Sequence, residues 1–288
     1  MSFLVRNYLT LFLLSLIWGS SFILMKRGLD EYSAMQVACL RLFIAFISLT
    51  PFLFNAIKIL KKKEIIPLIV SGFIGNGLPA FLFAKAQITL ESSFTGALNS
   101  LTPIFTLLVG IYLFKNKTSK KNILGIILGF LGTAVLYVSK VHSILNVEWD
   151  ILLIIIATFL YAISINVIYK YLRHMSPIYI SSLSFLFIGP FSGYYILSTD
   201  FINIVKTEAG IISFGYVCVL AILCTSVAII IFNQLLKDTS AYFASSVTYL
   251  IPIVALIWGV IDGELIQVSY FVGVFIVFLG IYLVNSKD

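Results

Sequence analysis

Long apolar stretches alternate with short polar breaks along the whole chain. Each stretch holds about 20 mainly apolar residues, enough for a helix to cross hydrocarbon about 30 Å thick. None shows the strict polar and apolar alternation of a membrane β-barrel strand. We therefore predict an all-α membrane protein with ten transmembrane helices. They are expected near residues 8–26, 33–55, 65–85, 92–114, 121–139, 150–171, 177–197, 209–230, 241–261 and 267–285.

Composition and the distribution of charge support a membrane location and predict an orientation. Hydrophobic residues make up 60% of the chain and charged residues 11%, against about 25% charged residues in soluble domains. The net charge of +7 does not indicate a nucleic-acid surface, because the basic residues gather in alternate loops. Thirteen lie on the side of the N-terminus and five on the other. The positive-inside rule then predicts a multi-pass protein of the cell (inner) membrane with both termini cytoplasmic.

The two halves of the chain resemble each other at a constant shift of 149 residues. The shift aligns Phe83 with Phe232, Phe94 with Phe243, Leu101 with Leu250, Pro103 with Pro252 and Gly110 with Gly259. Two apolar segments can align leucines by chance, but they rarely align prolines and glycines in the same order. Five helices per half is an odd number, so the halves must enter the membrane from opposite sides. We predict two inverted five-helix repeats, residues 1–144 and 145–288, in one membrane domain, with Pro103, Pro252, Gly110 and Gly259 in structural roles.

Arg41 is the one charged residue well inside a predicted helix. An arginine there costs at least about 2.5 kcal/mol on insertion scales, so it must face protein, water or a headgroup. It lies eight residues from the helix start at Ser33, so its long side chain has two alternatives. It either snorkels to the membrane surface or binds a substrate.

Uncharged polar residues recur at equivalent depths in both halves. The 149-residue shift carries Asn76 to Thr225, and Asn99 to Thr248, which is followed by Tyr249. A shared central cavity would explain these pairs, and hydrogen bonds between helices would explain them as well. Trp18 and Ser21 near the end of the first helix, and Tyr161 in the sixth, are further candidates for the cavity wall, although small residues such as Ser21 also serve close packing. Gly125 and Gly129 form G-x-x-x-G, which predicts close helix packing.

Several of these motifs together resemble the EamA-type family of the drug/metabolite transporter superfamily. They are Trp18-Gly-Ser-Ser-Phe22, Arg41, Ala97-Leu-Asn-Ser-Leu-Thr-Pro103, Ala244-Ser-Ser-Val-Thr-Tyr-Leu-Ile-Pro252 and Glu264. The resemblance covers essentially the whole chain. It implies ten helices, cytoplasmic termini, a central cavity, and export or exchange of amino acids and related metabolites. The chain departs from the family at Lys115, where the first repeat usually ends its fourth helix with an acidic residue.

The leading functional hypothesis is a secondary transporter of small, amphipathic metabolites that works by alternating access. No Asp or Glu lies in the middle of a predicted helix, so proton coupling would need rim carboxylates such as Glu91, Asp262 or Glu264, or protonation of the substrate itself. A channel or lipid-moving scaffold is the alternative. An intramembrane enzyme is a more distant one, because no catalytic pair or metal motif is visible. We expect no cofactor and no metal, a small-molecule substrate, the lipid bilayer as partner, and a monomer, since fused repeats complete a site within one chain.

Overall fold

The structure is a computed structural model that describes residues 3–116, 119–138, 149–263 and 269–285. Every regular element in these ranges is helical, which confirms the all-α prediction. In chain order the elements are α1 (Phe3–Leu29), α2 (Ala34–Ile59), α3 (Lys62–Gly72), η1 (Phe73–Gly77), α4 (Leu78–Ala86), α5 (Ser92–Leu98), η2 (Asn99–Leu101), α6 (Thr102–Tyr112), α7 (Lys120–Val138), α8 (Trp149–Val167), η3 (Ile168–Leu172), α9 (Pro177–Leu197), α10 (Phe201–Val205), α11 (Glu208–Ala221), η4 (Ile222–Val227), α12 (Ala228–Asp238), α13 (Ala241–Ser245), α14 (Val247–Ile261) and α15 (Ser269–Asn285).

Within the described ranges, eight helical stretches are long and apolar enough to cross a membrane. They coincide with eight of the ten predicted spans. The other two predicted spans match α7, of 19 residues, and α15, of 17 residues. The structure therefore supports a multi-pass membrane protein, and ten spans remains a prediction.

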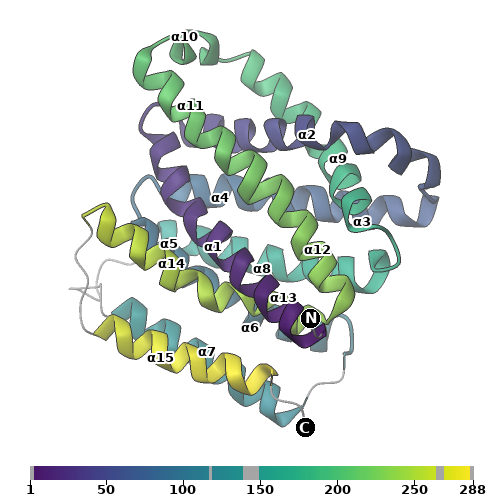
Figure 1. The fold of residues 1–288 in the computed structure, drawn as a ribbon, viewed down its shortest axis with the longest axis vertical. Coiled ribbons are helices and arrows are strands. Elements are labelled where there is room, and N and C mark those ends of the chain that lie inside the picture. The colour runs from purple at the N-terminus through teal and green to yellow at the C-terminus, as the bar shows by residue number, and fades with distance from the viewer. Residues whose placement is uncertain (1–2, 117–118, 139–148, 264–268, 286–288) are drawn as a thin grey trace.

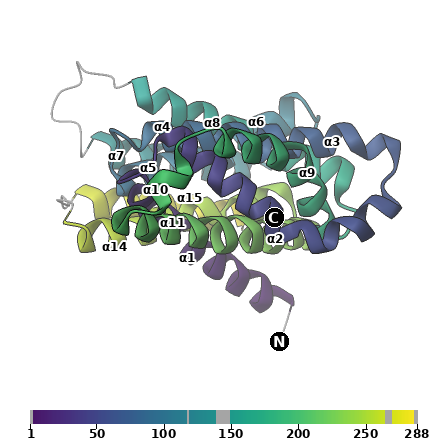
Figure 2. The same ribbon diagram turned by 90° about the horizontal axis from the view of Figure 1, so that it is seen from above.

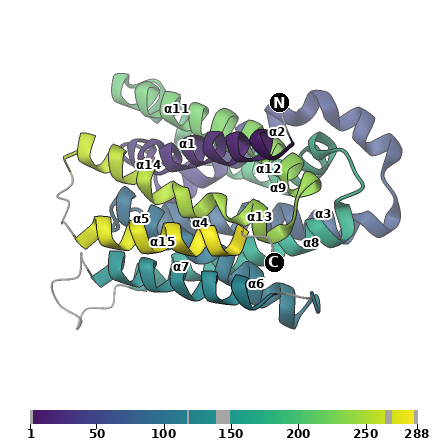
Figure 3. The same cartoon turned by 60° about the horizontal axis from the view of Figure 1, so that its bottom comes forward.

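The long helices lie side by side and run roughly along one direction (Figure 2). α7 and α15, from opposite halves of the chain, form a pair along one edge of the bundle (Figures 1 and 3). α2 packs against α9, α1 against α14, and α4 against α8, so these pairs also join the two halves. Large apolar side chains such as Phe54, Ile66 and Phe191 are exposed on the outside of the bundle, as a protein surrounded by lipid requires.

The pairing of α7 with α15 depends on glycines. A Cβ atom added to Gly280 would lie 2.5 Å from the carbonyl oxygen of Gly125 and 2.7 Å from the backbone nitrogen of Gly129. Only a residue without a side chain fits this approach. The close packing predicted for the G-x-x-x-G motif is confirmed, with α15 as the partner helix.

The described residues contain three π-helical turns, η1, η3 and η4, and two of them, η1 and η4, begin 149 residues apart, at Phe73 and Ile222. In η1, Asn76 Nδ2 donates to the carbonyl of Ser71 at 2.8 Å, and in η4, Thr225 Oγ1 donates to that of Leu220 at 3.0 Å. Each side chain thus reaches the carbonyl five residues earlier. Glycines and Pro79 predict the break in the first half, but the sequence of the second break, Ile-Leu-Cys-Thr-Ser-Val, contains neither residue type.

Pro103 follows the short 3₁₀ turn η2 and is the second residue of α6. A proline has no N–H, so the carbonyl four residues earlier loses its helical donor. Here that carbonyl belongs to Asn99, and the hydroxyl of Thr102 donates to it at 2.8 Å. The predicted structural role of Pro103 is therefore a local one, at the junction of two helix segments.

Pro252 lies inside α14 and deprives the carbonyl of Thr248 of its donor in the same way. The hydroxyl of Ser100, from the other half of the chain, donates to that carbonyl at 3.2 Å. Gly110 is also at a close contact, since a Cβ there would lie 2.8 Å from the Tyr242 hydroxyl. Gly259 is buried on α14.

Candidate functional site

A cavity of about 120 Å³ lies between the two halves of the chain. One water needs about 10–15 Å³ on this measure, so the cavity has room for a small solute. Its wall combines aromatic side chains, hydroxyls, amides and one cation. Eight of the nine residues that the sequence predicted for substrate binding contribute to the wall: Trp18, Ser21, Arg41, Asn76, Asn99, Tyr161, Thr225 and Thr248.

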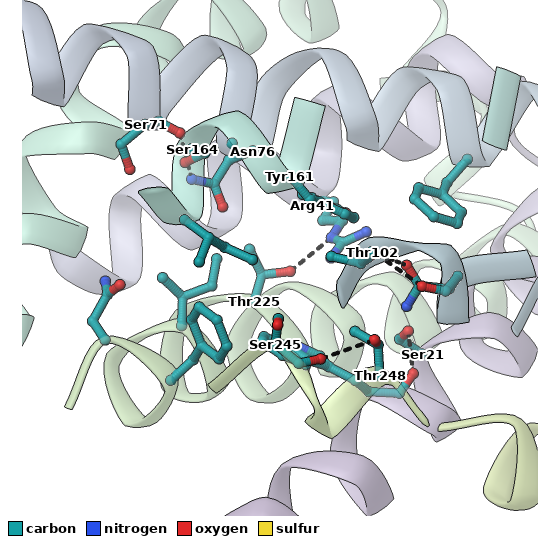
Figure 4. Close-up of a pocket in the computed structure, with 18 of the residues that line it drawn as sticks. Ser21, Arg41, Ser71, Asn76, Thr102, Tyr161, Ser164, Thr225, Ser245 and Thr248 are labelled. Atoms are coloured by element: carbon teal, nitrogen blue, oxygen red, sulfur yellow. Dashed lines mark hydrogen bonds between the residues drawn. The ribbon is translucent and has the colours of Figure 1, made fainter. Parts of the chain in front are cut away.

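Arg41 extends from α2 into this cavity and does not snorkel to a membrane surface (Figure 4). Its Nε donates to Thr225 Oγ1 at 2.7 Å, and Thr225 belongs to the other half of the chain. The Thr225 hydroxyl in turn donates to the carbonyl of Leu220. The π turn η4 therefore presents a hydroxyl oxygen that holds the guanidinium in one orientation.

Two aromatic pairs line the same cavity as the guanidinium. Trp18 of α1 packs on Phe232 of α12 with ring centroids 5.2 Å apart, and Tyr161 of α8 stacks on Phe83 of α4 with centroids 5.8 Å apart. The two phenylalanines differ by the 149-residue shift. The indole N–H of Trp18 donates to the carbonyl of Cys224 at 2.9 Å, which fixes that ring against η4. The cavity thus has an aromatic surface contributed from both halves.

Hydroxyl and amide groups complete the wall, and most of them are already hydrogen-bonded to backbone. Thr248 donates to the Ser245 carbonyl at 2.9 Å, and Ser21 donates to the Trp18 carbonyl at 2.6 Å (Figure 4). Their hydroxyl oxygens keep lone pairs for a donor. These residues therefore line the cavity, and the hydrogen bonds of Thr248 and Ser21 run along their own helical stretches and not between helices.

Tyr249 is the predicted binding residue that lies elsewhere. It is 1% exposed, and its hydroxyl lies against α7, where a Cβ on Gly129 would come within 3.0 Å of it. Successive side chains of a helix point about 100° apart. Because Thr248 faces the cavity, the next residue, Tyr249, points away from it. Tyr249 is a packing residue between α14 and α7.

Asn233 of α12 is a cavity residue that the sequence analysis missed. Its side chain is buried, its Nδ2 donates to Ser181 Oγ at 3.1 Å, and among the described atoms its Oδ1 has no hydrogen-bond partner. An unpaired buried acceptor is costly, so a solute donor is a favourable partner for it. The repeat comparison gave no signal here, because the 149-residue shift pairs Asn233 with Ala84.

No acidic residue and no histidine is among the described residues that line the cavity. The described part of the chain also contains no cluster of three or more His, Cys, Asp or Glu residues able to hold a metal ion. Of the carboxylates considered for proton coupling, Glu91 is the N-cap residue of α5 and Glu264 lies outside the described residues. Asp262 pairs with Lys26 and Arg27 at the end of α1.

Polar contacts join the two halves at both ends of the bundle. At the end that holds Asp262, Gln36 Nε2 donates to Asp200 Oδ1 at 2.9 Å. At the opposite end, His174 Nε2 lies 2.8 Å from Glu64 Oε1, and Arg6 Nη2 lies 2.9 Å from Asp238 Oδ2. The cavity lies between these two sets of contacts.

Comparison with known proteins places this architecture in a family. The sequence profile of the EamA-like transporter family matches the chain twice, at residues 6–138 and 148–286. The chain belongs to the EamA-like transporter family.

Its relatives are transporters by name. An uncharacterized transporter of Archaeoglobus fulgidus is 25% identical and covers 98% of this chain and 100% of its own length. The uncharacterized transporter YetK of Bacillus subtilis is 24% identical over 97% of this chain and 87% of its own. A probable amino-acid metabolite efflux pump of Salmonella typhimurium is 23% identical over 57% of this chain and 54% of its own.

The fold is also found among solved structures. One of them, a crystal structure, superimposes with a TM-score of 0.70 at 12% identity and covers 98% of this chain and 96% of its own. At that identity the likeness concerns the fold alone.

Proposed function

We propose that this protein is a secondary transporter that moves small metabolites, such as amino acids and related amphipathic solutes, by alternating access. Its two moving parts are inverted five-helix repeats, residues 1–144 and 145–288, which together supply ten transmembrane helices. Three observations support the repeats: the 149-residue shift, the paired π turns and the double match to one family profile. Substrate binds in the cavity between them.

The observation that carries the proposal is the Arg41 to Thr225 hydrogen bond inside this cavity. It crosses from one half of the chain to the other in the middle of the binding site. A solute that binds there contacts both halves at once, so its binding energy can couple to their relative movement.

The contacts at the two ends of the bundle fit the two gates of such a cycle. Asp262 with Lys26 and Arg27 closes one end, and Glu64 with His174 closes the other. Alternating access requires each set to break while the other holds. Each contact pairs a buried carboxylate with a partly exposed cation, so breaking it costs more than the about 0–1 kcal/mol of a fully exposed ion pair. The binding energy of the solute must offset that cost.

The loop charges support a position in the cell membrane with both termini in the cytoplasm. One chain supplies both halves of the cavity, which supports a working monomer. The alternative, a channel or lipid-moving scaffold, is separated from the transporter by saturation and by exchange.

The test is flux from proteoliposomes that contain the purified protein and a labelled mixture of amino acids and related metabolites, with and without a pH gradient. The proposal expects selective and saturable release. Arg41→Ala should lower that flux, and Lys58→Ala, which removes a charge from the exposed end of the same helix, should not. Linear, unselective release would favour the channel. No release from folded, inserted protein would contradict transport of this solute class.

A further inference from the structure

We infer that the preferred substrate is a small organic monoanion, a carboxylate without an ammonium group on the neighbouring carbon, and that the membrane potential drives its export. The inference rests on the proposed function and narrows it. It follows from the free donors of Arg41, from the absence of a negative charge around it, and from the charge that one transport cycle moves.

The guanidinium of Arg41 is held by one edge and free at the other. An arginine has five N–H donors, and among the described residues the bond from Nε to Thr225 is the only hydrogen bond that Arg41 makes. The two terminal amino groups, Nη1 and Nη2, therefore have no acceptor in the described part of the protein. A carboxylate can accept hydrogen bonds from both of these amino groups in a bidentate, charge-assisted interaction.

The surroundings of Arg41 favour a ligand with one net negative charge. A bound monoanion makes the site neutral overall, whereas a zwitterion leaves it with the charge of the guanidinium. An isolated charge away from water is costly. No carboxylate is among the described lining residues to compensate an ammonium.

An α-amino acid meets an additional cost in this geometry. Its ammonium is two bonds from the carboxyl carbon, so it must stay close to the guanidinium whenever the carboxylate binds there. The hydroxyl oxygens of Ser21 and Thr248 can accept from an ammonium, but they are neutral and do not compensate its charge. The unpaired amide oxygen, Asn233 Oδ1, is on the same helical stretch as Thr225 but eight residues further along, about 12 Å at the helical rise. It is out of reach of an α-ammonium, and a donor at the far end of a longer solute is the kind of partner that it lacks.

The charge moved in one cycle follows from the same residues. Arg41 is a fixed part of the site, so the charge that finally crosses the membrane is that of the solute together with any coupled ion. The described lining offers no acidic or histidine side chain to carry a proton. A monoanion therefore leaves with one negative charge, and an inside-negative potential drives it outward.

The loaded and empty forms then respond differently to voltage. With a monoanion on Arg41 the site is neutral, so its reorientation is insensitive to the potential. The empty site carries the positive charge of Arg41, so its return toward the negative side is accelerated. Net export should depend on the potential, and exchange of one anion for another should not.

The first arm of the test compares matched solutes in proteoliposomes. Each pair is a labelled amino acid and the 2-oxo acid with the same carbon skeleton, one pair aromatic and one branched aliphatic. Protein-free vesicles give the leak to be subtracted. The 2-oxo acid should leave at least about tenfold faster, which corresponds to about 1.4 kcal/mol. Arg41→Gln should remove that preference, and Lys58→Ala should keep it.

The second arm imposes a potassium diffusion potential with valinomycin. About 100 mV, inside negative, should raise the final outside-to-inside ratio of the 2-oxo acid roughly 40- to 50-fold. Exchange of labelled for unlabelled 2-oxo acid at equal concentrations should not change. A pH gradient without a potential should have no effect on net flux.

The outcomes separate this inference from the proposed function. Two results would overturn the inference and leave the proposed transporter function standing. One is saturable flux that is equal or faster for the amino acid. The other is flux that does not respond to the potential and follows the pH gradient. An absence of saturable flux for both members of each pair, from folded and inserted protein, would overturn both.

Discussion

At the scale of single residues, Thr225 positions Arg41 for binding of the solute. The hydroxyl accepts from Nε at 2.7 Å and donates to Leu220, so the guanidinium is oriented before any solute arrives. Preorganisation of this kind lowers the cost of binding. Thr225 is a positioning residue, because it acts on the solute through Arg41.

Thr225→Val keeps the shape of the side chain and removes the acceptor. Hydrogen bonds to charged groups are worth about 1.5–3 kcal/mol, so the half-saturating solute concentration should rise about tenfold or more. Thr225→Ser restores the hydroxyl and should restore the affinity, which a merely structural role would not require. Saturation curves of flux for the three proteins decide this, and equal curves for the valine and wild-type proteins would contradict it.

Asn233 provides a second prediction at this scale. Asn233→Ala removes the unpaired acceptor. It should weaken the binding of solutes that carry a donor at their far end, and it should change the binding of solutes without that donor little. Ser181→Ala is the matched control, because it removes the partner of Asn233 Nδ2 and leaves Oδ1 in place. Competition assays with hydroxylated and unhydroxylated solutes measure the difference, and equal weakening of both solutes would argue for a packing role.

The residues of the cavity were largely predictable from the sequence, for a physical reason. Polar side chains are costly in lipid, so those at equivalent depths in both halves, such as Asn76 and Thr225, pointed inward. Tyr249 was misplaced, because adjacency to Thr248 says nothing about the face of a helix. Asn233 was missed, because its equivalent, Ala84, is apolar.

At the scale of helices, apolar length predicted the elements well, and glycine spacing predicted close packing of α7 against another helix, which the structure identifies as α15. The π turn at η4 was not predictable from its own residues, since no proline or glycine marks it. Its position becomes clear only when Thr225 is seen to bond the carbonyl five residues earlier. Pro252 leaves the Thr248 carbonyl without its helical donor, and the hydroxyl of Ser100, from the other half of the chain, donates to it. No local sequence pattern predicts this long-range contact.

Gly280 tests the helix contact. Gly280→Leu inserts a side chain where even a Cβ would meet the backbone of α7 at 2.5 Å. Overpacking costs about 1–3 kcal/mol, so the midpoint of thermal unfolding in detergent should fall by several degrees. Gly215→Leu is the control, because nothing lies within 4 Å of a Cβ there. Equal unfolding temperatures for the two variants would contradict the packing account.

At the scale of the whole molecule, the cavity lies between contacts that join the two halves at opposite ends. Asp262 is 7% exposed and pairs with Lys26 and Arg27, and Glu64 is 3% exposed and pairs with His174. The sequence suggested Asp262, but not Glu64, as a rim carboxylate, and it revealed the partner of neither, because both partners are more than 100 residues away. Long-range pairing is the part of the fold that sequence patterns specify least.

Asp262→Asn and Glu64→Gln should shift the equilibrium between the two states, each open to one side of the membrane, in opposite directions. Each substitution weakens the ion pairs at one end of the bundle only. The readout is labelling of a cysteine introduced at the cavity residue Ile229, in a protein lacking its three native cysteines. A membrane-impermeant thiol reagent should react several-fold faster from the side of the weakened contact. Equal labelling of both variants from each side would show that these contacts do not gate the cavity.

The most direct test of the central claim, transport by alternating access, is counterflow. Proteoliposomes loaded with a high concentration of unlabelled solute are diluted into a trace of the same solute in labelled form. A carrier that exchanges one solute for another should accumulate the label transiently above its outside concentration, and Arg41→Ala should abolish this accumulation. Label that only equilibrates, with no overshoot at any loading, would contradict the account and indicate a channel.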